Sequence, residues 1–258
     1  MTRFSLHDMI SFDEDIDIVI NNAIENGVTK IILPAIDSDS FERQKKLSAL
    51  YSDIFYQMIG VHPTSIKENY HKELDLVYSE IATNTDVYVA IGEIGLDYYW
   101  EKEEDAKKNQ RDWFIKQLQL AREIDKPVII HSREAAADTL DIMKQEWADR
   151  KAVIHCYSYS AEMAKIYAKM GYYFGIGGVL TYKNARTLVE TVEYVSIEQL
   201  LLETDCPYLS PVPNRGKRND SSNLRYVAEK IAEIKNMSYD AVVEITELNA
   251  KRFFFGEK

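Results

Sequence analysis

Short apolar runs alternate with longer amphipathic stretches along the whole chain. Each apolar run predicts a strand, and the runs cover residues 30–36, 55–61, 87–96, 127–131, 152–155, 172–177 and 199–204. Between them apolar residues recur at spacings of three and four, as in residues 107–124 and 161–169, which predicts amphipathic helices. Strands and helices that alternate in this way are typical of βα units around a parallel sheet.

An eighth strand at about residues 4–7 would complete a barrel, although Phe4-Ser5-Leu6-His7 is a poor strand sequence. It precedes a helix that we expect to open at residues 12–15. We therefore predict an α/β fold, a (β/α)8 TIM barrel with an atypical first strand. A length of 258 residues suits such a barrel, and no linker or low-complexity segment divides the chain, so we expect a single domain over residues 1–258.

The composition narrows the class of protein. No run of about 18 apolar residues occurs, and the first residues lack the basic and apolar regions of a signal peptide, so we expect a cytoplasmic protein with no membrane association. Cys156 and Cys206 lie in apolar runs without C-x-x-C spacing, which predicts reduced thiols in the core. A net charge of −11 argues against a protein that coats nucleic acid through a basic face, but it is compatible with a metal site built from carboxylates.

Four polar residues stand at or near the C-terminal ends of predicted strands, where a barrel of this type carries its active site: Glu93, His131, His155 and Asp205. Glu93 lies in an apolar run between glycines, and a buried carboxylate is costly unless it is paired or holds a cation. A single strand-end histidine is more often a core residue than a ligand. Two on successive strands, after a strand-end glutamate, favour a metal site.

Asp205 follows the last apolar run and is a candidate both for metal binding and for accepting the proton of an attacking water. Glu203 shares its parity two residues earlier, and it is either a support for this site or a buried salt-bridge partner. His62, in G-V-H-P (60–63), also follows a strand and is a candidate to line the pocket, with a structural role as the alternative. His71 lies in a polar stretch, where we expect it to face solvent.

Phosphate binding has its own candidates. Arg215, Lys217 and Arg218 concentrate three cations in the loop after the strand that leads to Asp205, and guanidinium groups suit phosphate oxygens. The alternative is a solvated basic loop. Arg133 and Lys183 also follow strand ends and are candidates to contact a substrate backbone.

The sequence closely resembles the TatD family of metal-dependent deoxyribonucleases among the amidohydrolase-like barrels, over about residues 12 to 255. The motifs that carry the resemblance are G-V-H-P (60–63), G-E-I-G-L-D-Y (92–98), P-V-I-I-H-S-R (127–133), V-I-H-C-Y-S (153–158), G-I-G-G (175–178), T-Y-K-N-A (181–185), L-L-E-T-D-C-P-Y-L (201–209) and R-G-K-R-N (215–219). Each motif alone is weak, and together they are highly specific.

The resemblance implies a divalent-metal-dependent phosphodiester hydrolase that acts on DNA ends as an exonuclease, with DNA as substrate and no obligate protein partner. It implies two metal ions bridged by Glu93, with His131 and His155 completing one position and Asp205 contributing to the other. One ion would polarise the phosphate and the second would lower the pKa of the attacking water, with Glu93 and Asp205 as the catalytic carboxylates. Magnesium or manganese is the ion that the family implies, although a shell of histidine and carboxylate would also accept zinc.

The sequence departs from the family at its start. Members of the family usually carry an H-x-H pair on the first strand, whereas this chain has Ser5-Leu6-His7. If one residue is deleted after the pair, His7 takes the second position and becomes a metal ligand, while Ser5 replaces the first histidine. Without that deletion, neither histidine of the pair is present. We therefore expect the metal position that draws on Asp205 to be weak.

Two other functions remain open. One is an amidohydrolase acting on a small amide or lactone, although such enzymes often bridge their metals with a carbamylated lysine, where this chain has Glu93. The other is a degenerate barrel that binds metal or nucleic acid with weak or no turnover, which the altered first strand supports. A nuclease assay with and without chelator distinguishes these functions.

Overall fold

The computed structural model describes residues 2–4, 6, 7, 12, 14–66 and 70–257, and of residues 2–4, 6, 7 and 70 only the backbone. The chain forms two compact units. Unit 1 comprises Met1–Leu33, Asp53–Phe55 and Cys156–Lys258, and unit 2 comprises Pro34–Ser52 and Tyr56–His155.

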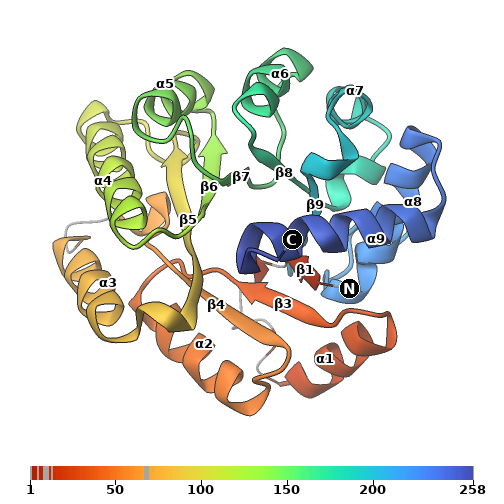
Figure 1. Cartoon of the computed structure of the whole chain (residues 1–258), viewed down its shortest axis with the longest axis horizontal. Coiled ribbons are helices and arrows are strands. Elements are labelled where there is room, and N and C mark those ends of the chain that lie inside the picture. Colours follow the sequence, from red (N-terminus) through yellow and green to blue (C-terminus); the bar gives the residue numbers. More distant parts are fainter. Residues whose placement is uncertain (1, 5, 8–11, 13, 67–69, 258) are drawn as a thin grey trace. The chain divides into compact units, whose positions relative to one another are not determined.

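Unit 2 is built on parallel strands in the order β4, β5, β6 and β7, which are Phe55–Ile59, Tyr88–Asp97, Val128–Arg133 and Ala152–Ile154. Its helices are α2 (Ser38–Leu50), α3 (Tyr70–Asn84), α4 (Glu104–Glu123) and α5 (Ala136–Glu146), together with the short 3-10 helices η2 (Pro63–Ser65) and η3 (Thr85–Val87). Figure 1 shows α3, α4 and α5 along one face of β5 and β6. The strands are apolar on both faces because helices or neighbouring strands cover them, as expected for a parallel sheet.

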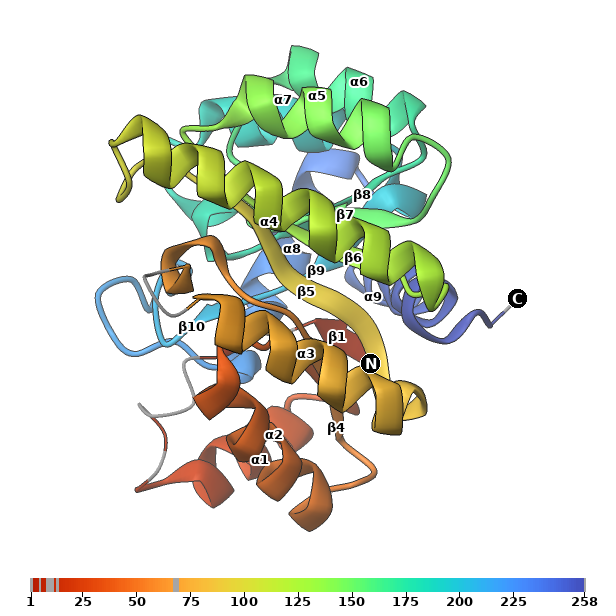
Figure 2. The same ribbon diagram turned by 90° about the vertical axis from the view of Figure 1, so that its left-hand side faces the viewer.

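Helix α4 fixes the strands against which it lies (Figure 2). Its apolar face buries Trp113, Phe114 and Leu118. Two buried glutamines are seven positions apart on the same face of this helix, and they bind the backbone where β4 and β5 end. Gln117 accepts from Val61 N (2.7 Å), just after β4, and Gln110 accepts from Asp97 N (2.8 Å), the last residue of β5, so both strand ends are held in place.

Strand β5 changes partner at its centre. Its pairing with β6 shifts between Ile91 and Ile94, and in this interval Glu93 N donates to Ala35 O (3.1 Å) while Ala35 N donates to Gly92 O (3.2 Å). A Cβ at position 92 would lie 2.7 Å from Ile129 Cβ, so glycine is needed for this close approach. The strand spans Tyr88–Asp97, close to the predicted run 87–96, and Glu93 lies four residues before its C-terminal end.

The described part of unit 1 holds its parallel strands in pairs. The pairs are β1 (Thr2–Phe4) with β3 (Lys30–Leu33), β8 (Tyr173–Ile176) with β9 (Leu200–Leu202), and β2 (Leu6–His7) with β10 (Asp205–Cys206). The helices of the unit are α1 (Ile16–Glu25), α6 (Ala161–Lys169), α7 (Arg186–Tyr194), α8 (Leu224–Lys235) and α9 (Tyr239–Ala250). Shorter turns of helix are η4 (Gly178–Thr181), η5 (Ile197–Gln199), η6 (Ser221–Asn223) and the π-helix η7 (Lys251–Phe255).

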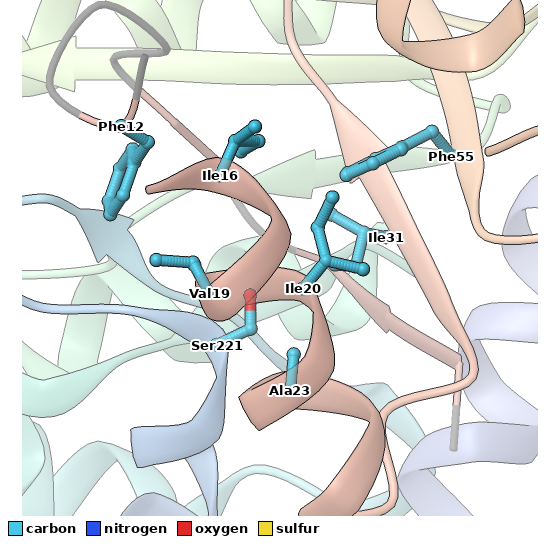
Figure 3. A pocket seen from close by; sticks show the side chains of 8 residues that line it. All are labelled: Phe12, Ile16, Val19, Ile20, Ala23, Ile31, Phe55 and Ser221. Atoms are coloured by element: carbon cyan, nitrogen blue, oxygen red, sulfur yellow. The ribbon is translucent and has the colours of Figure 1, made fainter. Parts of the chain in front are cut away.

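An apolar pocket lies beside α1 in unit 1 (Figure 3). Phe12, Ile16, Val19 and Phe55 are among its lining side chains, and the hydroxyl of Ser221 is the polar group that the figure shows there. A pocket with this lining offers no charged group to a phosphate or a metal ion. Within the described part of the chain, no helix has the length and apolarity needed to cross a membrane.

Every predicted apolar run contains a strand, and helix 161–169 has the predicted bounds. The start of the chain differs from the prediction, because Phe4 belongs to β1 whereas Leu6 and His7 form β2, which has a different partner. The last strand differs as well. β9 ends at Leu202, and Asp205 opens the separate strand β10 because it pairs with β2. Neither Cys156 nor Cys206 forms a disulfide bond; Cys206 is buried and Cys156 is half-buried.

Candidate functional site: a histidine and carboxylate cluster

Three imidazoles converge on one buried carboxylate in unit 2. Glu93 is 6% exposed, and its Oε1 lies 2.7 Å from His131 Nδ1, 3.7 Å from His62 Nε2 and 3.8 Å from His155 Nε2. The sequence grouped Glu93, His131 and His155 and gave His62 as a candidate to line the pocket. The structure places His62 at nearly the same distance from Glu93 as His155. The rings of His62 and His131 meet edge to face, with centroids 4.4 Å apart.

Each histidine is oriented by its own strand. His62 follows β4, and its Nδ1 lies 2.7 Å from the Thr64 hydroxyl and accepts from Thr64 N, which leaves Nε2 to face Glu93. His131 lies in β6 opposite Gly95, where a Cβ would meet His131 O at 2.0 Å, so glycine is required. His155 follows β7 and donates its backbone N–H to Ile130 O (2.9 Å).

A second carboxylate, which sequence reasoning missed, also contacts His131. Asp97 is 1% exposed, and its Oδ2 lies 3.1 Å from His131 Nε2, so the imidazole is held between two carboxylates. The other oxygen of Asp97 accepts from the backbone N–H groups of Tyr99 (3.0 Å) and Trp100 (3.1 Å). The sequence did contain a signal for Asp97. It lies four residues after Glu93 in an apolar strand, and side chains an even number of residues apart in a strand share a face.

The electrostatics of the cluster favour an ionised Glu93 carboxylate beside a protonated His131 imidazole. Burial alone would raise the pKa of the Glu93 carboxyl, but the charges of His155 and His62 and the hydrogen bond from His131 hold it well below its usual value. Burial opposes the charged form of His131, but hydrogen bonds to Asp97 and Glu93 raise its pKa to about 9. Burial and the neighbouring charge of His131 lower the pKa of His62.

The donor set fits a divalent cation. One ligand atom from each of His62, Glu93 and His131 lies within 4.8 Å of the others, and His155 contacts the same carboxylate. Imidazole nitrogen with carboxylate oxygen suits first-row metals and zinc, and the second contact of His131 with Asp97 is the usual way in which a ligating ring is held. Displacing the His131 proton would let such an ion take its place beside Glu93.

In unit 1, the side chain of Glu203 binds the backbone. It is 1% exposed, and its Oε1 accepts from Cys156 N at 2.7 Å. Asp205 opens β10 in register with Leu6, and Cys206 pairs with His7. The side chain of His7 and the whole of Ser5 lie outside the described residues, so the predicted ligand at this position stays a prediction.

The predicted phosphate-binding residues of the 215–218 loop are exposed. Arg218 forms an ion pair with Asp15 and lies over the Phe12 ring, 4.7 Å from its centroid. Arg215 lies 4.3 Å from the ring centroid of Tyr182, the residue before Lys183, and both cations are exposed. Lys217 is exposed in the same loop as Arg215.

Comparisons with known proteins agree on one family. Residues 5–255 match the model of the family described as TatD related DNase. The metal-dependent hydrolase YabD of Bacillus subtilis is 40% identical over 94% of each chain. The human deoxyribonuclease TATDN3 is 30% identical over 94% of this chain and 90% of its own.

Solved structures show the same relationship. The crystal structure of YJJV, a TatD homologue from Escherichia coli K12, matches with a TM-score of 0.89 and 27% identity over 99% of this chain and 98% of its own. Together with the alternating parallel strands and helices, this likeness confirms the predicted (β/α)8-barrel class.

Proposed function

The chain belongs to the TatD family and is a metal-dependent hydrolase, and on this basis we propose that it hydrolyses the phosphodiester bonds of DNA from its ends. The observation that carries the proposal is the buried Glu93 carboxylate, which three imidazoles approach within 3.8 Å. A buried carboxylate is costly unless it is paired or holds a cation, and a carboxylate with three imidazoles is a donor set that suits a divalent cation. The names of the matching family and of human TATDN3 support DNA as the substrate.

The proposed metal ligands are those that the sequence predicted. Glu93, His131 and His155 would hold one ion, and Glu93 would share the second with Asp205 and His7. Bound magnesium or manganese would polarise a phosphoryl oxygen and make water acidic enough to attack at neutral pH. His62 lies beside Glu93 and is proposed to face the substrate.

The remaining steps fall to side chains of the chain itself. Asp205 would accept the proton of the attacking water, because a carboxylate within hydrogen-bond reach of that water can serve as its general base. Substrate phosphates would be bound by five cations that the sequence proposed for this role, Arg133, Lys183, Arg215, Lys217 and Arg218. For Arg218 this requires exchange of its ion pair with Asp15, which is exposed and therefore contributes little stability.

The experiment that tests the proposal measures hydrolysis of a labelled DNA oligonucleotide and of bis-(p-nitrophenyl) phosphate, with added Mg²⁺ or Mn²⁺ and with chelator. We expect both activities to need the metal and to fall more than about 100-fold in Glu93→Gln, since losing even an indirect support of a metal ligand costs about 10- to 100-fold. Glu42→Gln is the matched control, because it makes the same change at an exposed position on α2 of the same unit.

The outcomes separate the alternatives. Activity that persists in chelator, or that Glu93→Gln retains, would refute the proposed site. Hydrolysis of small amides or lactones without phosphodiesterase activity would favour the amidohydrolase. Metal binding without turnover of any of these substrates would favour the degenerate barrel.

A further inference from the structure

Two large aromatic side chains lie exposed directly after β5. Tyr99 is 40% exposed and Trp100 is 64% exposed, and their rings meet edge to face with centroids 4.8 Å apart. A single exposed aromatic residue is common, but two adjacent ones forgo a large gain from burial. An exposed aromatic pair beside a candidate active site is therefore a candidate binding surface.

Cations flank the same pair. The guanidinium carbon of Arg133 lies 3.9 Å from the ring centroid of Tyr99 and 5.9 Å from that of Trp100. Lys102 Nζ lies 5.5 Å from the Tyr99 ring and is ion-paired with Glu134 at 3.1 Å. Arginine held over an aromatic face presents both a flat surface for stacking and a positive charge.

The aromatic pair is tied to the metal cluster through one carboxylate. Asp97 Oδ1 accepts from Tyr99 N and Trp100 N, while its Oδ2 lies 3.1 Å from His131 Nε2. The β5–β6 register adds a second tie, because Asp97 pairs with Arg133 and Tyr98 N donates to Arg133 O (2.9 Å). The backbone of the aromatic turn is thus fixed next to the candidate metal ligand, so ordering it on binding costs little.

We propose that Tyr99, Trp100 and Arg133 form a stacking platform that holds an unpaired nucleobase of the substrate beside the Glu93–His131 cluster. The inference rests on the proposed hydrolysis of DNA and adds the surface that receives the base. Every nucleobase has a π-face that stacks on an aromatic ring, and the adjoining phosphates are anions that Arg133 and Lys102 attract. Bases inside a duplex have their faces covered, so the platform selects an unpaired end.

A binding measurement tests the platform directly. Trp100 is exposed, whereas the other two of the three tryptophans, Trp113 and Trp147, are 3% and 1% exposed. A single-stranded phosphorothioate oligonucleotide, added to the Mg²⁺-loaded protein, is expected to quench tryptophan fluorescence. The change should vanish in Trp100→Phe, and quenching that persists in this variant would count against the platform.

A kinetic comparison then separates base stacking from phosphate binding. Two single-stranded oligonucleotides are used, one with normal ends and one with two abasic residues at each end. We expect the ratio of their kcat/KM values to fall on the order of tenfold in the double variant Tyr99→Ala, Trp100→Ala, because each stacked base contributes at this scale. Tyr78→Ala on α3 is the matched control, since Tyr78 is 39% exposed in the same unit, and it should leave the ratio unchanged.

Failure of the platform is distinguishable from failure of the proposed function. If bis-(p-nitrophenyl) phosphate is hydrolysed with Mg²⁺ but the ratio in the double variant equals that of the parent, the platform is wrong and the phosphodiesterase stands. If the parent hydrolyses neither this compound nor either oligonucleotide with Mg²⁺ or Mn²⁺, the proposed function fails and the platform fails with it.

Discussion

The backbone of β8 passes unusually close to Glu203, which makes Gly175→Ala a sharp test of how this buried carboxylate is held. A Cβ at position 175 would lie 1.9 Å from Glu203 Oε2 and 2.5 Å from its Cδ. The carboxylate has little room to move, since Glu203 is 1% exposed and its Oε1 accepts from Cys156 N at 2.7 Å. Either the carboxylate gives up its hydrogen bond from Cys156 N, or β8 and β9 move apart.

Both responses are costly. A buried N–H group without its acceptor costs about 1–3 kcal/mol, and forcing an extra carbon into a packed core costs about 1–3 kcal/mol. We expect Gly175→Ala to lower the free energy of unfolding by ~2–3 kcal/mol. If the free energy of unfolding falls by about 3 kcal/mol for each molar increase in urea, the urea concentration at the unfolding midpoint should fall by roughly 0.7–1 M.

Gly177→Ala is the matched control. It lies two residues along the chain with φ −114, and its Cβ would meet Glu203 O at 3.5 Å, an ordinary contact. Its midpoint should stay close to that of the parent. The same Gly175→Ala change, made in a Glu203→Ala background, should cost much less because the clashing oxygens are gone. Equal midpoints for the two glycine variants, or an undiminished cost without Glu203, would refute the reasoning.

Further predictions concern metal binding, pH-dependent stability and substrate binding. The pKa of His131 is about 9 in the metal-free protein, so an ion that binds there at pH 7 should displace up to one proton, and metal affinity should rise until the pH passes about 9. By the same linkage, the stabilisation from charged His131 in the metal-free protein is complete below about pH 6.5 and is lost as the pH rises through about 9. The number of protons released on metal binding is measured by calorimetry in buffers of different ionisation enthalpy. A binding enthalpy that is the same in every buffer would contradict this assignment. Replacing Arg215 and Arg218 with alanine should weaken DNA binding and reduce its salt slope by about one unit for each phosphate that the loop no longer binds, whereas an unchanged slope would assign the loop to solvent. Ser5→His should tighten the weaker metal position and raise turnover, and calorimetry that finds two equally tight sites in the parent, or no gain in the variant, would show that the register of the first strand was assigned wrongly.

Much of the fold and part of the candidate site followed from local sequence pattern. Apolar runs between amphipathic stretches located the strands, because parallel strands covered on both sides must be apolar throughout. Glu93, His131 and His155 could be grouped for the same reason, since consecutive parallel strands place polar residues at one edge of a sheet. The length of β5 followed from the apolar run 87–96, whereas its change of partner near Gly92 did not.

The tertiary structure decided the contacts that depend on register and close approach. Asp97 is an ordinary acid in sequence, and only the pairing of Gly95 with His131 brings its carboxylate to the imidazole. Asp205 belongs to a strand of its own because its partner is β2, at the other end of the chain. Arg218 meets Asp15 across 203 positions of sequence, a contact that no local pattern encodes. The sequence by itself determined which segments are strands and which residue types gather at their ends. Which atoms meet was decided by strand register and by glycines that admit close backbone approach, because both arise between segments far apart in the chain.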